Sequence, residues 1–216
     1  MRAAISKFFV DVKAIFHGRN LIWQGIAFAV TYFLVVSGFD WWIVTTLRDS
    51  PLRAIAMGAG FIGFFAPIAV PLICFALGAL RRNRKLLKAG LLLAQAEITA
   101  LLLSFFYKSL TGRPGPTQFH LAGSSLTDIS HVFRFGFLEG GVFWGWPSSH
   151  VIVSVAGAMV LMLLYKNNAW IKYVALAYAL YIALAVSITF HWFSDGVAAV
   201  IFGTVIGVTV VRSARD

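Results

Sequence analysis

Two short polar stretches of the chain could carry chemistry, and each borders a long apolar run. The first is WPSSH (146–150), which puts two serines and a histidine at the start of an apolar segment. Proline suits the first turn of a helix, and the backbone N–H groups of Ser148, Ser149 and His150 would then be free to bind an anion at the positive end of the helix dipole. A plain Pro-Ser cap explains the serines, but capping does not require an imidazole. The stretch therefore predicts an anion site.

The second stretch is HWFSD (191–195), in which His191 and Asp195 are four residues apart and share a face if the segment is helical. A carboxylate on one imidazole nitrogen fixes the tautomer and stabilises positive charge on the ring. Such a ring could be a general base, or a nucleophile that accepts a phosphoryl group. A surface ion pair is the ordinary explanation of this spacing. At the mouth of a membrane helix, however, an ionisable pair predicts a functional site.

Fixed positive charge comes from a third stretch, KSLTGRPGP (108–116). Its Gly-Arg-Pro-Gly core breaks a helix and folds Arg113 back. An anionic group needs cationic partners, and arginine can bind phosphate oxygens in a bidentate manner. Snorkelling at the membrane surface is the alternative explanation, and for Lys108 taken alone it is favoured.

These stretches need a scaffold, and the composition indicates a polytopic α-helical membrane protein. Of the 216 residues, 60% are hydrophobic and 12% are charged, which leaves too few polar residues to cover a soluble domain of this size. Apolar runs longer than about 18 residues predict membrane-spanning helices. The fold class is therefore all-α, with six transmembrane helices at approximately 21–39, 53–81, 89–107, 148–165, 169–190 and 194–211.

The whole chain, residues 1–216, is predicted to form a single membrane-embedded domain. Residues 1–19 are expected to form an amphipathic helix in the membrane interface, because apolar residues such as Phe8 share one helical face while Asp11 falls on the other. A short solvated segment before the first span is the alternative.

The distribution of positive charge predicts the orientation. With both termini in the cytoplasm, that side holds thirteen of the eighteen Lys and Arg, including those of a short basic turn, RRNRKLLK (81–88). This positive-inside pattern places the loop of 108–150 and its site on the periplasmic or extracellular face of the cell inner or plasma membrane. The net charge of +10 arises from these flanks, which face lipid headgroups, so nucleic acid is not an expected partner. The outer side holds five cations: Arg48, Arg53, Lys108, Arg113 and Arg134.

Taken in order, the three polar stretches resemble the type-2 phosphatidic acid phosphatase family, which shares its histidine chemistry with vanadium haloperoxidases. The motifs of that family are K-x6-R-P, P-S-G-H and S-R-x5-H-x3-D. The chain offers Lys108 with Pro116 at the matching spacing, then PSSH (147–150), then His191 with Asp195. The six spans and the outward-facing site agree with the family, so the resemblance covers spans one to six.

Four positions depart from these motifs. Gly115 stands where the first motif has its arginine, although an arginine lies two residues earlier. Ser149 replaces the glycine of the second motif, and Leu184 and Ala185 occupy the Ser and Arg positions of the third. Two phosphate-binding arginines of the family are thus missing in register. The chain offers two substitutes near the site, Arg113 and Arg134.

The resemblance implies a role for each matching residue. His191 would attack phosphorus and form a phosphohistidine, Asp195 would orient His191, and His150 would protonate the departing oxygen. The three equatorial oxygens would be neutralised by a set of phosphate-binding groups: Lys108, Arg113, Ser148 and the Ser149 amide.

The scheme that the resemblance implies requires no metal and no other cofactor. His120 and His131 in the outer loop keep a metal site open, but their spacing matches no standard ligand pattern. Solvated loop histidines are the favoured explanation for both.

Glu97 stands near the middle of the third predicted span, where an ionised carboxylate costs roughly 2.5–3.5 kcal/mol on insertion scales. A structural hydrogen bond with Gln95, Thr99 or a neighbouring helix is favoured. A contact with a lipid tail or a role in proton transfer is left open.

The function predicted from these residues is an integral membrane phosphatase that removes phosphate from a lipid at the outer face of the membrane. Phosphatidic acid, phosphatidylglycerol phosphate, undecaprenyl pyrophosphate and the phosphates of lipid A are candidate substrates. Two alternatives remain open: a lipid phosphotransferase with the same histidine, and a non-catalytic protein that binds or moves phospholipids. The expected partners are the lipid phosphate and membrane lipids, and the oligomeric state is left open.

Overall fold

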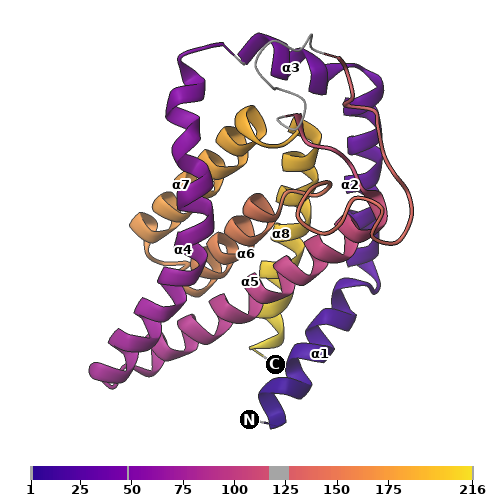
Figure 1. The fold of residues 1–216 in the computed structure, drawn as a ribbon. Helices are drawn as coiled ribbons and strands as arrows, with labels where there is room; N and C mark the ends of the chain where they lie inside the picture. Colours follow the sequence, from indigo (N-terminus) through magenta and orange to yellow (C-terminus); the bar gives the residue numbers. More distant parts are fainter. Residues whose placement is uncertain (1, 48, 117–126, 216) are drawn as a thin grey trace.

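The structure, a computed structural model, describes residues 2–47, 49–116 and 127–215, and this part of the chain contains helices joined by loops (Figure 1). The all-α prediction is confirmed. In Figure 1 both termini lie at one end of the molecule, and the short helix α3 lies at the other. The helices are α1 (Arg2–Ile15), α2 (Arg19–Val36), α3 (Phe39–Leu47), α4 (Leu52–Leu80), α5 (Arg84–Thr111), α6 (Ser149–Leu164), α7 (Ala169–Thr189) and α8 (Phe193–Ser213).

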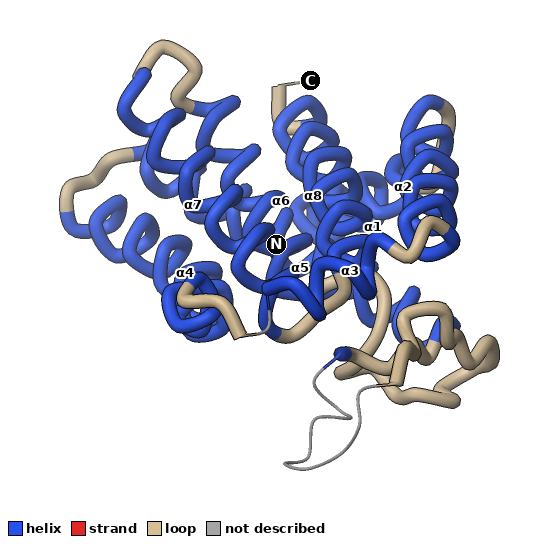
Figure 2. The backbone as a smooth tube through the Cα atoms, turned by 90° about the horizontal axis from the view of Figure 1, so that it is seen from above, coloured by secondary structure: helices blue, strands red, loops and turns tan. Residues whose placement is uncertain are grey.

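Five of the described helices, α2, α4, α5, α7 and α8, are long and apolar enough to cross a membrane. This number fits the predicted multi-pass class. The remaining predicted span, the fourth (148–165), corresponds to α6, which is apolar but has only 16 residues. Figure 2 shows these helices from above, with the described parts of the loop between α5 and α6 (112–116 and 127–148) at one side of them.

Helix α5 is longer than the predicted third span because both of its ends are defined by capping residues. The Asn83 side chain accepts hydrogen bonds from the N–H groups of Lys85 and Leu86 (3.0 and 3.2 Å), which starts the helix inside the predicted basic turn. The prediction of a turn over 81–88 is therefore wrong for its second half. At the other end Gly112 adopts the left-handed conformation with φ 47° and closes the helix with a bond to the carbonyl of Lys108.

Helices α6 and α8 form the most extensive helix pair of the described chain, and glycines let them approach closely. A Cβ atom on Gly203 would lie 2.7 Å from the carbonyl oxygen of Ile152, and one on Gly207 would lie 2.6 Å from the Cβ of Met159. Small residues spaced four apart are the usual device for such close packing of membrane helices. These contacts hold α6 against the middle of α8, and the Ser148 N–H, which donates to the carbonyl of Asp195, joins the two helix starts.

The N-terminal helix α1 packs against α8 and α2. Asp11, predicted on its polar face, is buried, and its Oδ2 accepts a hydrogen bond from Nε2 of Gln95 at 2.5 Å. Phe9 on the same helix is exposed. The predicted division into an apolar and a polar face is therefore wrong at Asp11, because a tertiary contact with α5 determines its position.

We expect Gly203→Val to push α6 and α8 apart and to destabilise the protein by about 1–3 kcal/mol, the usual cost of overpacking. The matched control is Gly25→Val, because a Cβ at Gly25 meets no atom within 4 Å. Thermal unfolding of both variants in detergent micelles measures the difference. Equal unfolding temperatures would contradict the close packing.

Candidate functional site

The three polar stretches of the sequence converge at the ends of three helices. Lys108 lies at the end of α5, His150 in the first turn of α6, and His191 between α7 and α8. Together with Ser149 they line one end of a cavity of about 460 Å³, called here the histidine cavity. Its remaining walls are largely apolar and come from α4, α5, α6, the outer loop and Phe190: Gly63, Phe64, Pro67, Ile68, Leu101, Phe105, Phe143, Trp144, Val153 and Phe190.

His191 and Asp195 form a buried pair. The Nδ1 atom of His191 lies 3.0 Å from Oδ2 of Asp195, and the imidazole is only 6% exposed. The same carboxylate oxygen accepts the N–H of Trp192 at 3.3 Å, which fixes it in the first turn of α8. Because Nδ1 is engaged, Nε2 is the ring nitrogen that remains for a ligand.

Arg113 holds the other oxygen of Asp195. Its Nη1 donates to Oδ1 of Asp195 at 2.5 Å, and its Nη2 donates to Oδ2 of Asp40 at 2.7 Å. Further bonds run from Nε and Nη2 to the carbonyl of Ser130 and from Nη1 to the hydroxyl of Ser194. The side chain is fully buried and does not line the histidine cavity. The predicted phosphate contact of Arg113 is therefore not part of the geometry of this structure.

Asp40, from α3, is the site residue that the sequence analysis missed. It directly follows the first predicted span (21–39), and the structure buries it completely. Its Oδ1 accepts the N–H of Ser194 at 2.8 Å, and its Oδ2 accepts the hydroxyl of Ser194 at 2.5 Å as well as the bond from Arg113. An isolated acid at the end of an apolar segment was the available signal, since ionisable residues at such places are usually partnered.

Lys108 is buried but reaches the histidine cavity. Its ammonium donates to the backbone carbonyl of Phe143 at 3.1 Å. An ammonium group has three donors, so two remain for a ligand.

The start of α6 carries two polar atoms without a partner. The Ser148 hydroxyl and Nδ1 of His150 are buried and make no hydrogen bond to any described residue. Leaving such groups unpaired costs about 1–3 kcal/mol each, a cost that a bound ligand can remove. Contrary to the sequence analysis, the Ser148 N–H is not free, since it donates to the carbonyl of Asp195 at 3.3 Å. The Ser149 hydroxyl bonds to that of Ser104 at 2.9 Å.

The remaining predicted site residues lie in the outer loop. Arg134 is exposed and does not line the histidine cavity, although its backbone N–H donates to the carbonyl of Thr111 at 3.0 Å. His131 is exposed. His120 lies outside the described residues. Within the described ranges, no three His, Cys, Asp or Glu side chains are grouped so as to hold a metal ion.

Three of the positions that depart from the family motifs differ in their surroundings. A Cβ on Gly115 would lie 3.1 Å from the carbonyl oxygen of Phe190, so a side chain there would be tightly packed against the backbone. Ala185 is buried in the apolar core and Leu184 is exposed, and neither lines the histidine cavity. The cations of the described site are therefore Lys108 and Arg113, of which only Lys108 reaches this cavity.

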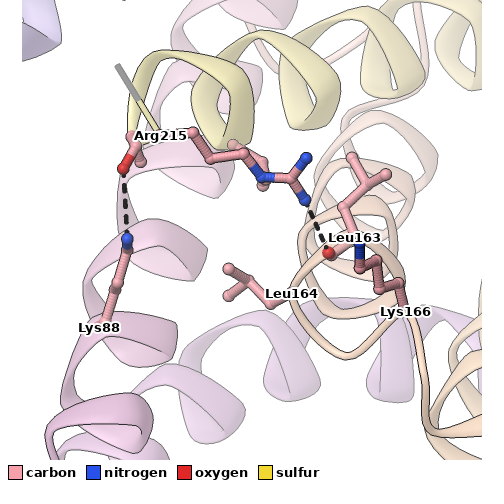
Figure 3. Close-up of a pocket in the computed structure, with 7 residues that line it drawn as sticks. Lys88, Leu163, Leu164, Lys166 and Arg215 are labelled. Atoms are coloured by element: carbon pink, nitrogen blue, oxygen red, sulfur yellow. Dashed lines mark hydrogen bonds between the residues drawn. The ribbon is translucent and has the colours of Figure 1, made fainter.

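A separate pocket lies near the ends of α6 and α8 and has a structural explanation (Figure 3). Lys88 donates to the carbonyl of Ala214 at 3.2 Å, and Arg215 donates to the carbonyl of Leu163 at 3.1 Å. Cations at the C-terminal ends of helices satisfy free carbonyls and oppose the helix dipole. This pocket contains none of the predicted site residues.

The fold and the site define a class: a multi-pass helical membrane protein with a buried His–Asp pair, a second histidine and a lysine at the mouth of an apolar cavity. A family model described as the PAP2 superfamily matches residues 85–216, well over half of the chain. The chain therefore belongs to the PAP2 superfamily, as the resemblance predicted, and this membership supports phosphatase-type activity. The match covers α5 to α8, so α1 to α4, including Asp40, lie outside it. Comparisons with curated proteins and with solved structures found no match.

We expect Asp40→Ala to destabilise the protein by about 3–5 kcal/mol, because it leaves the buried Arg113 guanidinium with one carboxylate instead of two. Thermal unfolding in detergent measures the loss. Glu139→Ala, which removes an exposed carboxylate from the outer loop, is the control and should unfold like the wild type. If both variants unfold alike, the buried network is not as the structure describes it.

Proposed function

We propose that the protein is a membrane-bound phosphatase that removes phosphate from a lipid. The histidine cavity carries this proposal, because one end presents Lys108, His150 and His191 while the rest of its wall is apolar. A molecule that fits both parts has an anionic headgroup and an apolar tail. The phosphatase-type chemistry of the superfamily supports hydrolysis at the headgroup.

In the first step, Nε2 of His191 attacks phosphorus, and the bond from phosphorus to the lipid oxygen breaks. The electron pair stays on that oxygen, which takes a proton from His150; a monoester leaves as a lipid alcohol and a pyrophosphate as a lipid phosphate. Asp195 stabilises the positive charge that develops on the His191 ring. Lys108, the Ser148 hydroxyl and the Ser149 N–H at the start of α6 hold the equatorial oxygens. Arg113 acts through Asp195, whose orientation it fixes.

In the second step, a water molecule attacks the phosphohistidine and gives its proton to His150. The bond between phosphorus and Nε2 breaks, inorganic phosphate leaves, and both histidines return to their starting states. No metal takes part in the proposed steps.

The proposed orientation puts the site at the outer face of the cell membrane with both termini in the cytoplasm. It rests on the positive-inside distribution and on a count of six crossings, in which the short α6 is the fourth span. Helix α1 would then lie at the cytoplasmic interface. A 16-residue helix is about 24 Å long, short of the roughly 30 Å hydrocarbon core, so α6 would start below the outer surface and hold the site within the membrane.

We expect purified protein in detergent with EDTA to release phosphate from at least one lipid phosphate in a panel of phosphatidic acid, phosphatidylglycerol phosphate, undecaprenyl pyrophosphate and lipid A. His191→Ala should lose about 10³-fold or more of this activity, because it removes the nucleophile. The control is His131→Ala, which removes an exposed loop histidine and should leave the rate unchanged.

Full activity in His191→Ala would overturn the nucleophile assignment, and loss of activity with EDTA would overturn metal independence. Product analysis with an added lipid or sugar alcohol separates hydrolysis from phosphotransfer. Binding without turnover across the whole panel would favour the non-catalytic alternative.

We also expect a defined pH dependence. Burial lowers the pKa of His191 below its ordinary value, although the hydrogen bond to Asp195 opposes this shift. Nε2 must be unprotonated to attack, so kcat/KM should fall on the acid side only below about pH 6.5, the ordinary histidine value. Asp195→Asn removes the anion that raises this pKa, so its acid limb should move to lower pH as its rate falls. The ionisation of the substrate affects the wild type and Asp195→Asn equally, so it cancels when their two pH profiles are compared. An acid limb that moves to higher pH would contradict the assignment.

A further inference from the structure

A second cavity, of about 490 Å³, lies between α4, α5, α6 and α7 and is called here the Glu97 cavity. Its wall is apolar apart from a few groups, and no Lys or Arg lines it. The two cavities share Pro67 of α4 as a wall. They are therefore neighbouring cavities.

Helices α5 and α6 each line both cavities with residues on one face. On α5, Lys108 and Leu101 line the histidine cavity, while Glu97, four residues before Leu101, lines the Glu97 cavity. On α6, His150 lines the first and Ser154, four residues on, lines the second. Glu97 lies eleven residues from Lys108, which is roughly 16 Å along a helix. Glu97 is therefore too far from Lys108 to contact the same phosphate.

The Glu97 carboxyl has no partner among the described residues. It is 8% exposed, and neither a hydrogen bond nor an ion pair connects it to the described part of the chain. The structural hydrogen bond favoured from the sequence is absent there, because Thr99 donates to the carbonyl of Gln95 and Gln95 donates to Asp11.

The space around this carboxyl is created by a glycine. A Cβ on Gly157 of α6 would lie 2.5 Å from Oε1 of Glu97. Ser154 and Tyr178, which also line the cavity, bond to each other at 2.8 Å. An apolar cavity of this size with a few polar groups has the usual features of a small-molecule site.

The side chains that line the Glu97 cavity indicate which class of ligand it binds. A buried carboxyl with no cation nearby is stabilised in its neutral form, which can donate one hydrogen bond and accept others. A hydroxyl group satisfies such a carboxyl, whereas a hydrocarbon tail leaves it unpaired and a phosphate finds no cation. We infer that the Glu97 cavity binds a lipid alcohol with its hydroxyl on Glu97. This inference rests on the proposed function in one respect, since a lipid alcohol is the product class of that reaction.

The test uses His191→Ala protein in detergent and a photoreactive dioleoylglycerol with a diazirine in one chain, beside the same probe with its hydroxyl methylated. We expect the alcohol to label α5 and α6 around Glu97 about tenfold more than the ether, which is the worth of one good hydrogen bond. Glu97→Leu should lose this preference and Glu97→Gln should keep it. Ala175→Leu, which fills the cavity, should lose labelling about tenfold, while Ala177→Leu on the exposed face of the same helix should not.

Equal labelling by the alcohol and the ether, or an unchanged preference in Glu97→Leu, would overturn the inference and leave a site for hydrocarbon tails only. Thermal unfolding checks the variants: Glu97→Leu removes an unpaired buried carboxyl and should unfold no lower than the parent. Phosphate release is measured separately on the wild type. If it fails while the labelling pattern holds, the proposed function falls and this site stands. If release succeeds without the pattern, the inference falls alone.

Discussion

The buried ion pairs of Arg113 with Asp40 and Asp195 are the constraint on which the rest of the site depends. A guanidinium taken out of water costs several kcal/mol unless its donors are all satisfied. Here two carboxylates, a hydroxyl and a backbone carbonyl surround it, and the rings of Phe133 and Trp192 lie 4.8 and 5.6 Å from it. These partners come from α3, the outer loop and the start of α8, so three distant segments must meet before the charge is stable. This arrangement fixes the position of the Asp195 oxygen that bonds to His191.

Because Arg113 is bound to Asp40 and Asp195, other groups must hold a phosphate. In the proposed mechanism, one lysine and the start of α6 carry the charge that the family's motif arginines would otherwise share. Helix N-termini and backbone N–H groups act at short range and do not need to be desolvated at the moment of reaction. The unpaired Ser148 hydroxyl and His150 Nδ1 are then functional, because their unmet hydrogen bonds become available to the ligand. The close contact of α6 with α8 keeps these atoms in place beside the His–Asp pair.

Much of this architecture is visible in the sequence, and the parts that are not have a common physical cause. Apolar runs determine the helices, and a helix-breaking Gly-Arg-Pro-Gly stretch determines the end of α5, so the sequence could place Lys108, His150 and His191 at helix ends. It could not show that Arg113 turns toward Asp195, because that choice depends on Asp40, about seventy residues away. The predictions for Asp11 and Glu97 were wrong in opposite ways. Asp11 has a tertiary partner that periodicity cannot reveal, whereas Glu97 makes no hydrogen bond to its sequence neighbours Gln95 and Thr99.

The two neighbouring cavities differ in charge, and under the proposed chemistry this difference separates substrate from product. Lys108 and the α6 N-terminus would stabilise an anion in the histidine cavity, whereas the Glu97 cavity has a largely apolar wall and no described cation. A phosphorylated lipid is confined to the histidine cavity, because moving a dianion into an apolar cavity costs far more than any hydrogen bond returns. Hydrolysis removes that charge and leaves a hydroxyl, whose transfer costs only a few kcal/mol and is offset by a bond to a carboxyl. The proposed reaction would therefore change which cavity the lipid favours, and it would give a role to a carboxyl that lies beyond the reach of the phosphate.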